Sequence, residues 1–81
     1  MTALPLYAFV AGDTMGVVVL GRPEKTVGDL AENLLRATGV RVKRRGSFHI
    51  MHHDRILDPQ ATLGTQGLRL LDRIDLVWDE V

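Results

Sequence analysis

One amphipathic segment in the middle of the chain, flanked on both sides by strand-like runs, most constrains the fold. Its apolar residues recur three and four positions apart, at Val27, Leu30, Ala31, Leu34 and Leu35. That spacing puts them on one face of a helix, with mostly polar residues on the other face. A lone amphipathic helix must bury its apolar face against another element. The sequence therefore predicts one helix packed on a sheet.

Residues at both ends of this segment indicate where the helix begins and ends. The Thr26 hydroxyl can accept an amide proton from the first turn, and Asp29 adds negative charge at the positive end of the helix dipole. Gly39 is a typical stop signal. We therefore expect a helix from Thr26 to Thr38.

The runs before the helix are typical of a β-hairpin. Residues 4–11 are apolar and place Tyr7 and Phe9 on one face of a strand, and residues 17–20 are rich in valine. The Gly12-Asp13 pair between the two runs is typical of a tight turn.

Three shorter runs after the helix predict further strands, at residues 47–52, 56–57 and 74–78. The last run places Ile74, Leu76 and Trp78 on one face. The order of elements is then β-β-α-β-β-β, within a single domain that covers all 81 residues, 1–81. We expect an α+β fold in which a mixed sheet wraps one helix and the last strand lies beside the first.

The composition argues against several classes of function. Without cysteine, the chain has no disulfide and no thiol nucleophile or ligand. Its formal net charge is zero, whereas chains that coat nucleic acid are usually basic. No apolar run approaches the roughly 20 residues of a membrane span. We expect a cytoplasmic protein that binds neither nucleic acid nor membrane.

Three histidines, His49, His52 and His53, form a potential metal or catalytic cluster. On an extended strand His49 and His53 would lie about 13 Å apart at ~3.3 Å per residue, with His52 on the opposite face. A metal site needs three or four ligands within about 2 Å of one ion. Unless the turn folds back, these side chains cannot chelate together. We therefore expect no metal, no cofactor and no catalytic residue, and we interpret the histidines as polar residues on a solvated strand and turn.

A short basic cluster, Arg41, Lys43, Arg44 and Arg45, precedes the third predicted strand. A solvated loop, a docking patch for an acidic partner and a phosphate-binding patch would each contain such residues. The chain has only one Trp, one Tyr and two Phe, so it lacks a row of aromatic side chains on which bases could stack. Nucleic acid is the least favoured of the three.

Several motifs carry a family resemblance. Residues 56–63 contain a short strand and a Thr-Leu turn. Gly67-Leu68 then gives a glycine-apolar step, and residues 72–77 give a turn aspartate followed by the last strand. With the helix start at residues 23–27, this pattern resembles ubiquitin-like domains. The resemblance implies a ubiquitin-like β-grasp fold, which many unrelated functions share. Ubiquitin-like modifiers end in Gly-Gly, whereas this sequence ends in Trp78-Asp79-Glu80-Val81, so we do not expect a conjugated modifier.

A narrower resemblance rests on the two ends of the chain. The opening residues 4–9, the Gly12-Asp13 turn and the ending 74–80 resemble the small B (gamma) subunit of bacterial toluene-type diiron monooxygenases. That resemblance implies a noncatalytic subunit, with no iron ligands of its own, docked on the large diiron hydroxylase subunit of a toluene, other aromatic or alkene monooxygenase.

Two alternatives remain open at this point. One is a free-standing bacterial ubiquitin-like module that binds other proteins, such as those that accompany secretion systems. The other is a small enzyme or metal protein built on the histidines.

A subunit of this kind should bind through apolar or aromatic side chains surrounded by a charged rim. The candidate partner-binding residues are Tyr7, Phe9, Arg44, Arg45 and Trp78. Tyr7 and Phe9 qualify if they face outward, and Trp78 could instead cap the core beneath the helix.

Overall fold

The computed structural model describes residues 3–39 and 42–79. It contains a hairpin of β1 (Leu4–Val10) and β2 (Val17–Gly21), then helix α1 (Val27–Thr38). Three strands follow, β3 (Phe48–His52), β4 (Arg55–Leu57) and β5 (Arg73–Trp78), with the short 3-10 helix η1 (Leu63–Thr65) before β5. The predicted order β-β-α-β-β-β is confirmed. Arg41, Glu80 and Val81, which belong to the motifs above, lie outside the described residues.

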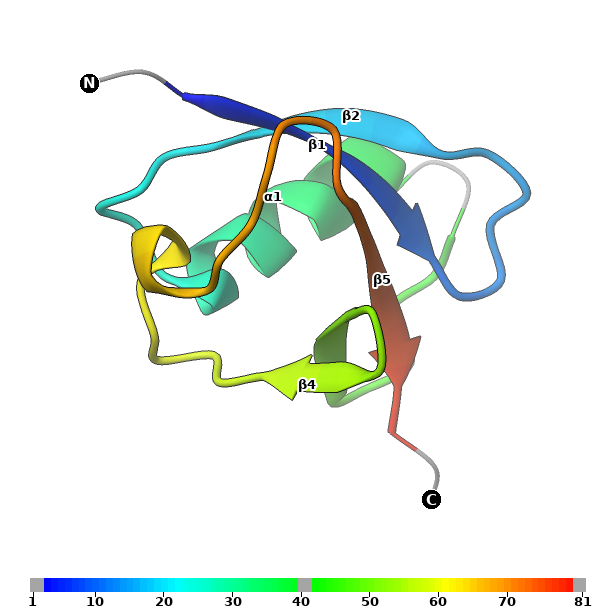
Figure 1. Cartoon of the computed structure of the whole chain (residues 1–81). Helices are drawn as coiled ribbons and strands as arrows, with labels where there is room; N and C mark the ends of the chain where they lie inside the picture. The colour runs from blue at the N-terminus through cyan, green and yellow to red at the C-terminus, as the bar shows by residue number, and fades with distance from the viewer. Residues whose placement is uncertain (1–2, 40–41, 80–81) are drawn as a thin grey trace.

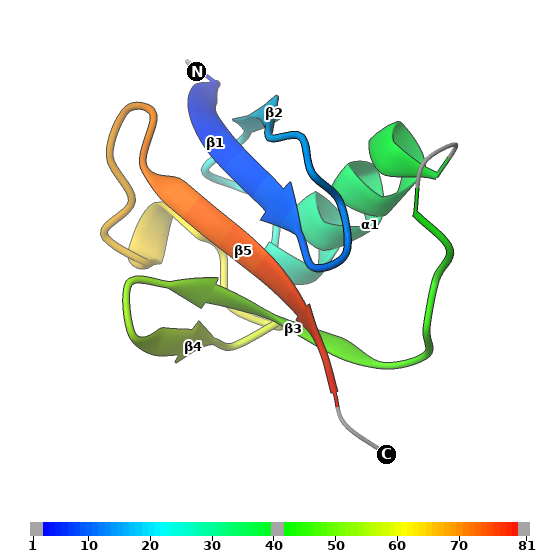
Figure 2. The ribbon, with the colours of Figure 1, turned by 90° about the vertical axis from the view of Figure 1, so that its right-hand side faces the viewer.

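The five strands form one mixed sheet in the order β2-β1-β5-β3-β4. β1 and β5 run parallel at its centre, and the other neighbours are antiparallel. The last strand therefore lies beside the first, as predicted. Figures 1 and 2 show α1 crossing one side of this curved sheet, so the sheet has one covered face and one open face.

Helix α1 begins as its sequence predicts. The Thr26 hydroxyl accepts from the Asp29 amide at 3.1 Å, and the Asp29 carboxylate accepts from the Thr26 amide at 3.2 Å. This reciprocal capping box satisfies two amides that the helix itself leaves unpaired. The backbone carbonyls of Pro59 and Ala61 accept two more, from Gly28 and Val27, which ties the start of the helix to the segment after β4.

The core lies between α1 and the covered face of the sheet. The helix contributes its predicted apolar face, and the strands contribute alternate residues. The buried apolar residues are Leu6, Ala8, Val10, Val27, Leu30, Ala31, Leu34, Ile50, Leu57, Leu63, Ile74, Leu76 and Trp78. Because strand residues alternate between faces, the neighbours of these buried positions project from the open face, where a partner can reach them.

Candidate docking surface

The open face of the sheet carries an aromatic pair on β1. Tyr7 and Phe9 project away from the core, as their alternation with Leu6 and Ala8 predicts. Their ring centroids lie 5.2 Å apart at a tilt of 41°. Gly16 lies against these rings, since a Cβ there would come within 2.7 Å of Phe9. The rings therefore fill the surface beside the hairpin loop.

Strand β2 extends this apolar surface toward the edge of the sheet. Val18 pairs with Tyr7, and Leu20 pairs with Pro5. Both side chains are largely exposed, Leu20 at 63%. An edge strand usually places polar side chains on its solvated face, so the valine and leucine at these positions make this face a candidate docking surface. The valine-rich run at 17–20 contained this signal, but only a pairing register distinguishes the outward residues from the inward ones.

Most of the exposed large apolar side chains gather around β1 and β2. Leu70 and Leu71 belong to this group, because the amide of Leu71 donates to the Pro5 carbonyl of β1 at 2.8 Å. Together with the half-buried Phe9, they form what we call the β1–β2 surface: Tyr7, Phe9, Met15, Val18, Leu20, Leu70 and Leu71. Among the described residues, the one exposed large apolar side chain outside it is Ile56, on β4 at the far edge of the sheet.

A charged pair borders the aromatic side chains. The Arg73 guanidinium lies over the Phe9 ring, 4.1 Å from its centroid, and forms an ion pair with Asp75 at 3.0 Å. A cation above an aromatic face is attracted by the ring quadrupole. The apolar centre thus has a charged rim on its β5 side, which is the usual layout of a protein-binding surface.

The backbone of β2 is also open to a partner. The Tyr7 amide donates to Asp72, on the β5 side of β1. Because backbone groups alternate in an antiparallel ladder, Tyr7 and Pro5 do not bond to β2. Their register partners Val18 and Leu20 therefore direct their own N–H and C=O groups toward the free edge of the sheet. No described strand pairs with that edge.

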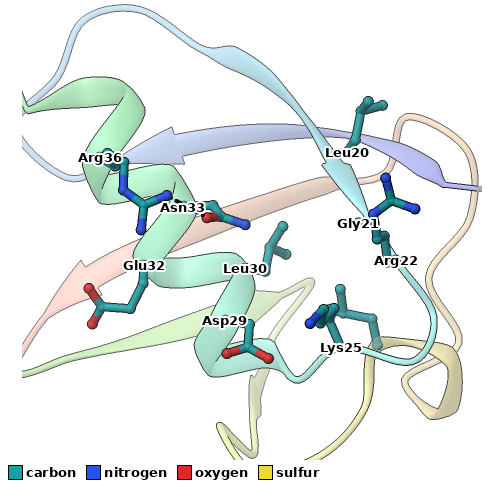
Figure 3. Close-up of a pocket in the computed structure, with 10 residues that line it drawn as sticks. Leu20, Gly21, Arg22, Lys25, Asp29, Leu30, Glu32, Asn33 and Arg36 are labelled. Atoms are coloured by element: carbon teal, nitrogen blue, oxygen red, sulfur yellow. Dashed lines mark hydrogen bonds between the residues drawn. The ribbon is translucent and has the colours of Figure 1, made fainter.

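A groove runs between α1 and the end of β2 (Figure 3). Its two carboxylates are already bonded, Asp29 in the capping box and Glu32 to Arg44. Arg22 and Lys25 line the same groove, and the side chains within residues 3–39 and 42–79 offer them no partner. The groove is therefore effectively basic, and it adjoins the open edge of β2.

Trp78 does not lie on this surface. It is 8% exposed and packs in the core, where its ring meets Phe48 edge-on with the centroids 6.0 Å apart. Its indole Nε1 donates to the Ala11 carbonyl at 3.0 Å, which ties the end of β5 to the β1–β2 hairpin. Trp78 therefore lies on the covered face of the sheet and takes the alternative role that the sequence left open, in the core.

In the basic cluster before β3, Arg44 is bonded to a described residue, whereas Lys43 and Arg45 are not. Arg44 forms a two-pronged contact with Glu32 of α1, at 3.1 and 3.2 Å, and its guanidinium lies 5.4 Å from the centroid of the Phe48 ring. Lys43 and Arg45 are exposed, with no described partner. The cluster thus fastens the loop before β3 to the helix and leaves two cations in solvent.

The histidines occupy three different environments. His49 pairs with Asp79 at 2.7 Å on the open face. His52 is 6% exposed and pairs with Asp72 at 2.9 Å, so the expectation that it is a solvated polar residue was wrong. His53 leaves the strand altogether, with a φ of 56° in the turn between β3 and β4. The strand spacing assumed from the sequence therefore does not apply to His53.

Hydrogen bonds lower the pKa values of the two carboxylates that pair with these histidines, Asp72 and Asp79. The backbone N–H of Arg69 and the His52 ring lower the pKa of Asp72 below its usual 3.8. The His49 ring and a bond from Ser47 lower the pKa of Asp79 in the same way. Hydrogen bonds to the charged form of a carboxyl favour that form. Both carboxylates are therefore ionised at neutral pH.

Comparison with solved structures defines the class of protein. A chain of the structure described as the toluene 4-monooxygenase HD complex with the inhibitor 4-bromobenzoate is similar over 96% of this chain and 100% of its own length, with a TM-score of 0.86 and 21% identity. Caldiarchaeum subterraneum ubiquitin is similar over 98% of this chain and 96% of its own, with a TM-score of 0.78 and 18% identity. The fold is the ubiquitin-like β-grasp.

Comparison with protein families is more specific. The family model described as toluene-4-monooxygenase system protein B matches residues 3–78. The chain belongs to this family. A search of curated proteins finds no significant match. In the described part of the chain, no helix is long and apolar enough to cross a membrane.

Proposed function

We propose that this chain is a noncatalytic accessory subunit of a cytoplasmic, multicomponent diiron monooxygenase hydroxylase and acts by binding the large hydroxylase subunit. The observation that carries the proposal is the family match over residues 3–78. The similarity to a chain of the toluene 4-monooxygenase complex over its entire length supports it.

The β1–β2 surface is the proposed docking site. It has an apolar and aromatic centre in Tyr7, Phe9, Val18 and Leu20 and a charged rim in Arg73 and Asp75. Binding energy at interfaces is concentrated in such central side chains, while the rim excludes water. A stable contact should bury more than ~1,000 Å² in total. We expect the open edge of β2 and the adjoining groove to contribute to this area as well.

The open edge of β2 supports the same assignment. Its backbone groups at Val18 and Leu20 have no partner strand, and its own sequence, Val-Val-Val-Leu-Gly, contains neither charge nor proline. Natural proteins protect an exposed apolar edge because another chain can pair with it. A dedicated partner that covers the edge removes this hazard.

The remaining predicted residues take smaller roles in this proposal. Arg45 is exposed in the loop before β3 and is free to contact an acidic region of the partner. Arg44 is already bonded to Glu32, so its truncation should weaken the loop before β3 more than the interface itself. Rim charges mainly affect the rate of association and its salt dependence.

The test is co-expression of the tagged chain with a diiron hydroxylase large subunit from the same organism, followed by affinity purification. Wild type should recover the large subunit at a fixed ratio. Leu20→Arg should abolish recovery, since it places a charge in the apolar centre. Ile56→Arg is the matched control: its side chain is 61% exposed, against 63% for Leu20, but it lies on β4 at the opposite edge.

Two outcomes would contradict the proposal. A wild-type chain that elutes alone, as a monomer, would favour the free-standing interaction module. Recovery lost equally with both arginine variants would remove the β1–β2 surface from the proposal while leaving the subunit assignment in place.

A further inference from the structure

The turn between β3 and β4 and the loop before β5 bring together three potential metal ligands. One nitrogen each from His52 and His53 and one carboxylate oxygen of Asp72 all lie within 4.8 Å of one another. The three residues line a hollow at this end of the sheet, together with Gln66 and Gly67. This cluster lies on different elements from the proposed docking side chains of β2.

The backbone of His53 creates the cluster. Its φ of 56° is the left-handed conformation, which few residues other than glycine adopt, although histidine adopts it more often than most. That conformation folds the turn back, so the His53 ring lies against the His52 ring, with centroids 4.2 Å apart. An unusual backbone conformation that is kept in a tight turn is a reason to look for a function.

The spacing of two of the ligands matches that around a zinc ion. His52 Nε2 and Asp72 Oδ2 lie 2.9 Å apart. Around tetrahedral zinc, with each ligand at about 2.0–2.1 Å, neighbouring ligand atoms are roughly 3.3 Å apart. An ion can therefore replace the proton that these two atoms share after an expansion of a few tenths of an ångström. The exposed His53 ring needs the larger movement, and its side chain is free to make it.

We propose that His52, His53 and Asp72 form a binding site for a divalent first-row transition metal such as Zn²⁺, with water completing the coordination. Imidazole suits Zn²⁺, Ni²⁺ and Cu²⁺, whereas Mg²⁺ and Ca²⁺ prefer all-oxygen sites. The site is separate from the proposed subunit function, and either can be wrong without the other.

The surroundings hold the ligands in place. The backbone N–H of Arg69 donates to Asp72 Oδ2 at 2.9 Å, which orients the carboxylate. Burial fixes the His52 ring at the end of β3. Groups that orient metal ligands in this way raise the affinity of a site.

The positive charges around the hollow lower the affinity for any cation and disfavour hard cations most. Arg55 and Arg69 both line it. The Arg55 guanidinium is bonded to the Gln66 carbonyl at 2.8 Å, which restrains it. With one carboxylate ligand and two nearby cations, the site lacks the negative charge that a hard cation requires.

The experiment is a calorimetric titration of the full chain with Zn²⁺, repeated with Co²⁺ while its visible absorption is recorded. We expect one ion per chain and a cobalt spectrum typical of nitrogen and oxygen ligands in low coordination. His53→Asn keeps a residue that tolerates the left-handed conformation but lacks the imidazole. His53→Asn and Asp72→Asn should each weaken the binding of Zn²⁺ at least tenfold.

His49→Ala is the control, because His49 pairs with Asp79 elsewhere on the sheet. It should leave the affinity unchanged. His52 is left intact, since replacing a buried side chain could unfold the chain. The proposal is overturned if Zn²⁺ does not bind, if the two ligand variants bind as wild type does, or if Mg²⁺ binds equally well.

Discussion

The same substitution at two leucines on opposite sides of the sheet should have very different effects on stability. Leu34 is 0% exposed and points from α1 into the core. Truncating such a leucine to alanine removes buried methyl groups and leaves a cavity, at a cost of about 2.7–5 kcal/mol. Leu20 is 63% exposed, so roughly 37% of its side chain is out of water. Full burial of a leucine side chain contributes ~1.5–3 kcal/mol, so Leu20→Ala should lower the free energy of unfolding by roughly 0.5–1 kcal/mol.

Urea unfolding followed by circular dichroism measures both free energies. A domain of 81 residues is expected to have about 4–12 kcal/mol of total stability. Leu34→Ala should therefore lower the unfolding midpoint severely, and Leu20→Ala only slightly. In thermal melts of a domain this size, each kcal/mol corresponds to roughly 4–8 °C. Equal losses at the two positions would refute the assignment of Leu34 to the core and Leu20 to a free surface.

Three further substitutions test particular contacts. Thr26→Ala removes the acceptor of the capping box and should cost about 1 kcal/mol in urea unfolding. Trp78→Phe removes the indole bond to Ala11 and should cost at least about 1 kcal/mol, with loss of the fluorescence change on unfolding. The bond from the Arg69 amide lowers the pKa of Asp72, so this carboxylate contributes stability that is present above pH 3.8 and is lost as the pH falls through the lower folded pKa. Acid titration should therefore destabilise wild type more steeply than Asp72→Asn below about pH 4.

The helix and the strands could be predicted because their signals are local. The spacing of Leu30 and Leu34 and the Thr26 cap each depend on residues within a few positions. Residues Ile74, Leu76 and Trp78 were placed on one face by simple alternation, and the structure confirms it. Once one helix had to cover one sheet, few topologies remained, and the parallel pairing of β1 with β5 followed.

The functional surfaces were harder to predict because they depend on contacts between distant residues. Alternation groups Trp78 with Ile74 but does not say which face the helix covers. The pair between Arg44 and Glu32 joins residues 12 positions apart. The histidine cluster needed the left-handed turn at His53, and a histidine has no strong local signal for that conformation.

Amide hydrogen exchange of the free and assembled chain tests most directly whether the chain docks through β2 and the open face beside it. In the free chain the amides of Val18 and Leu20 face the open edge and should exchange rapidly. On assembly with the hydroxylase large subunit they should become protected, while β4, at the opposite edge, keeps its rate. Protection confined to β4, or no change at β2 in a stable complex, would contradict the account.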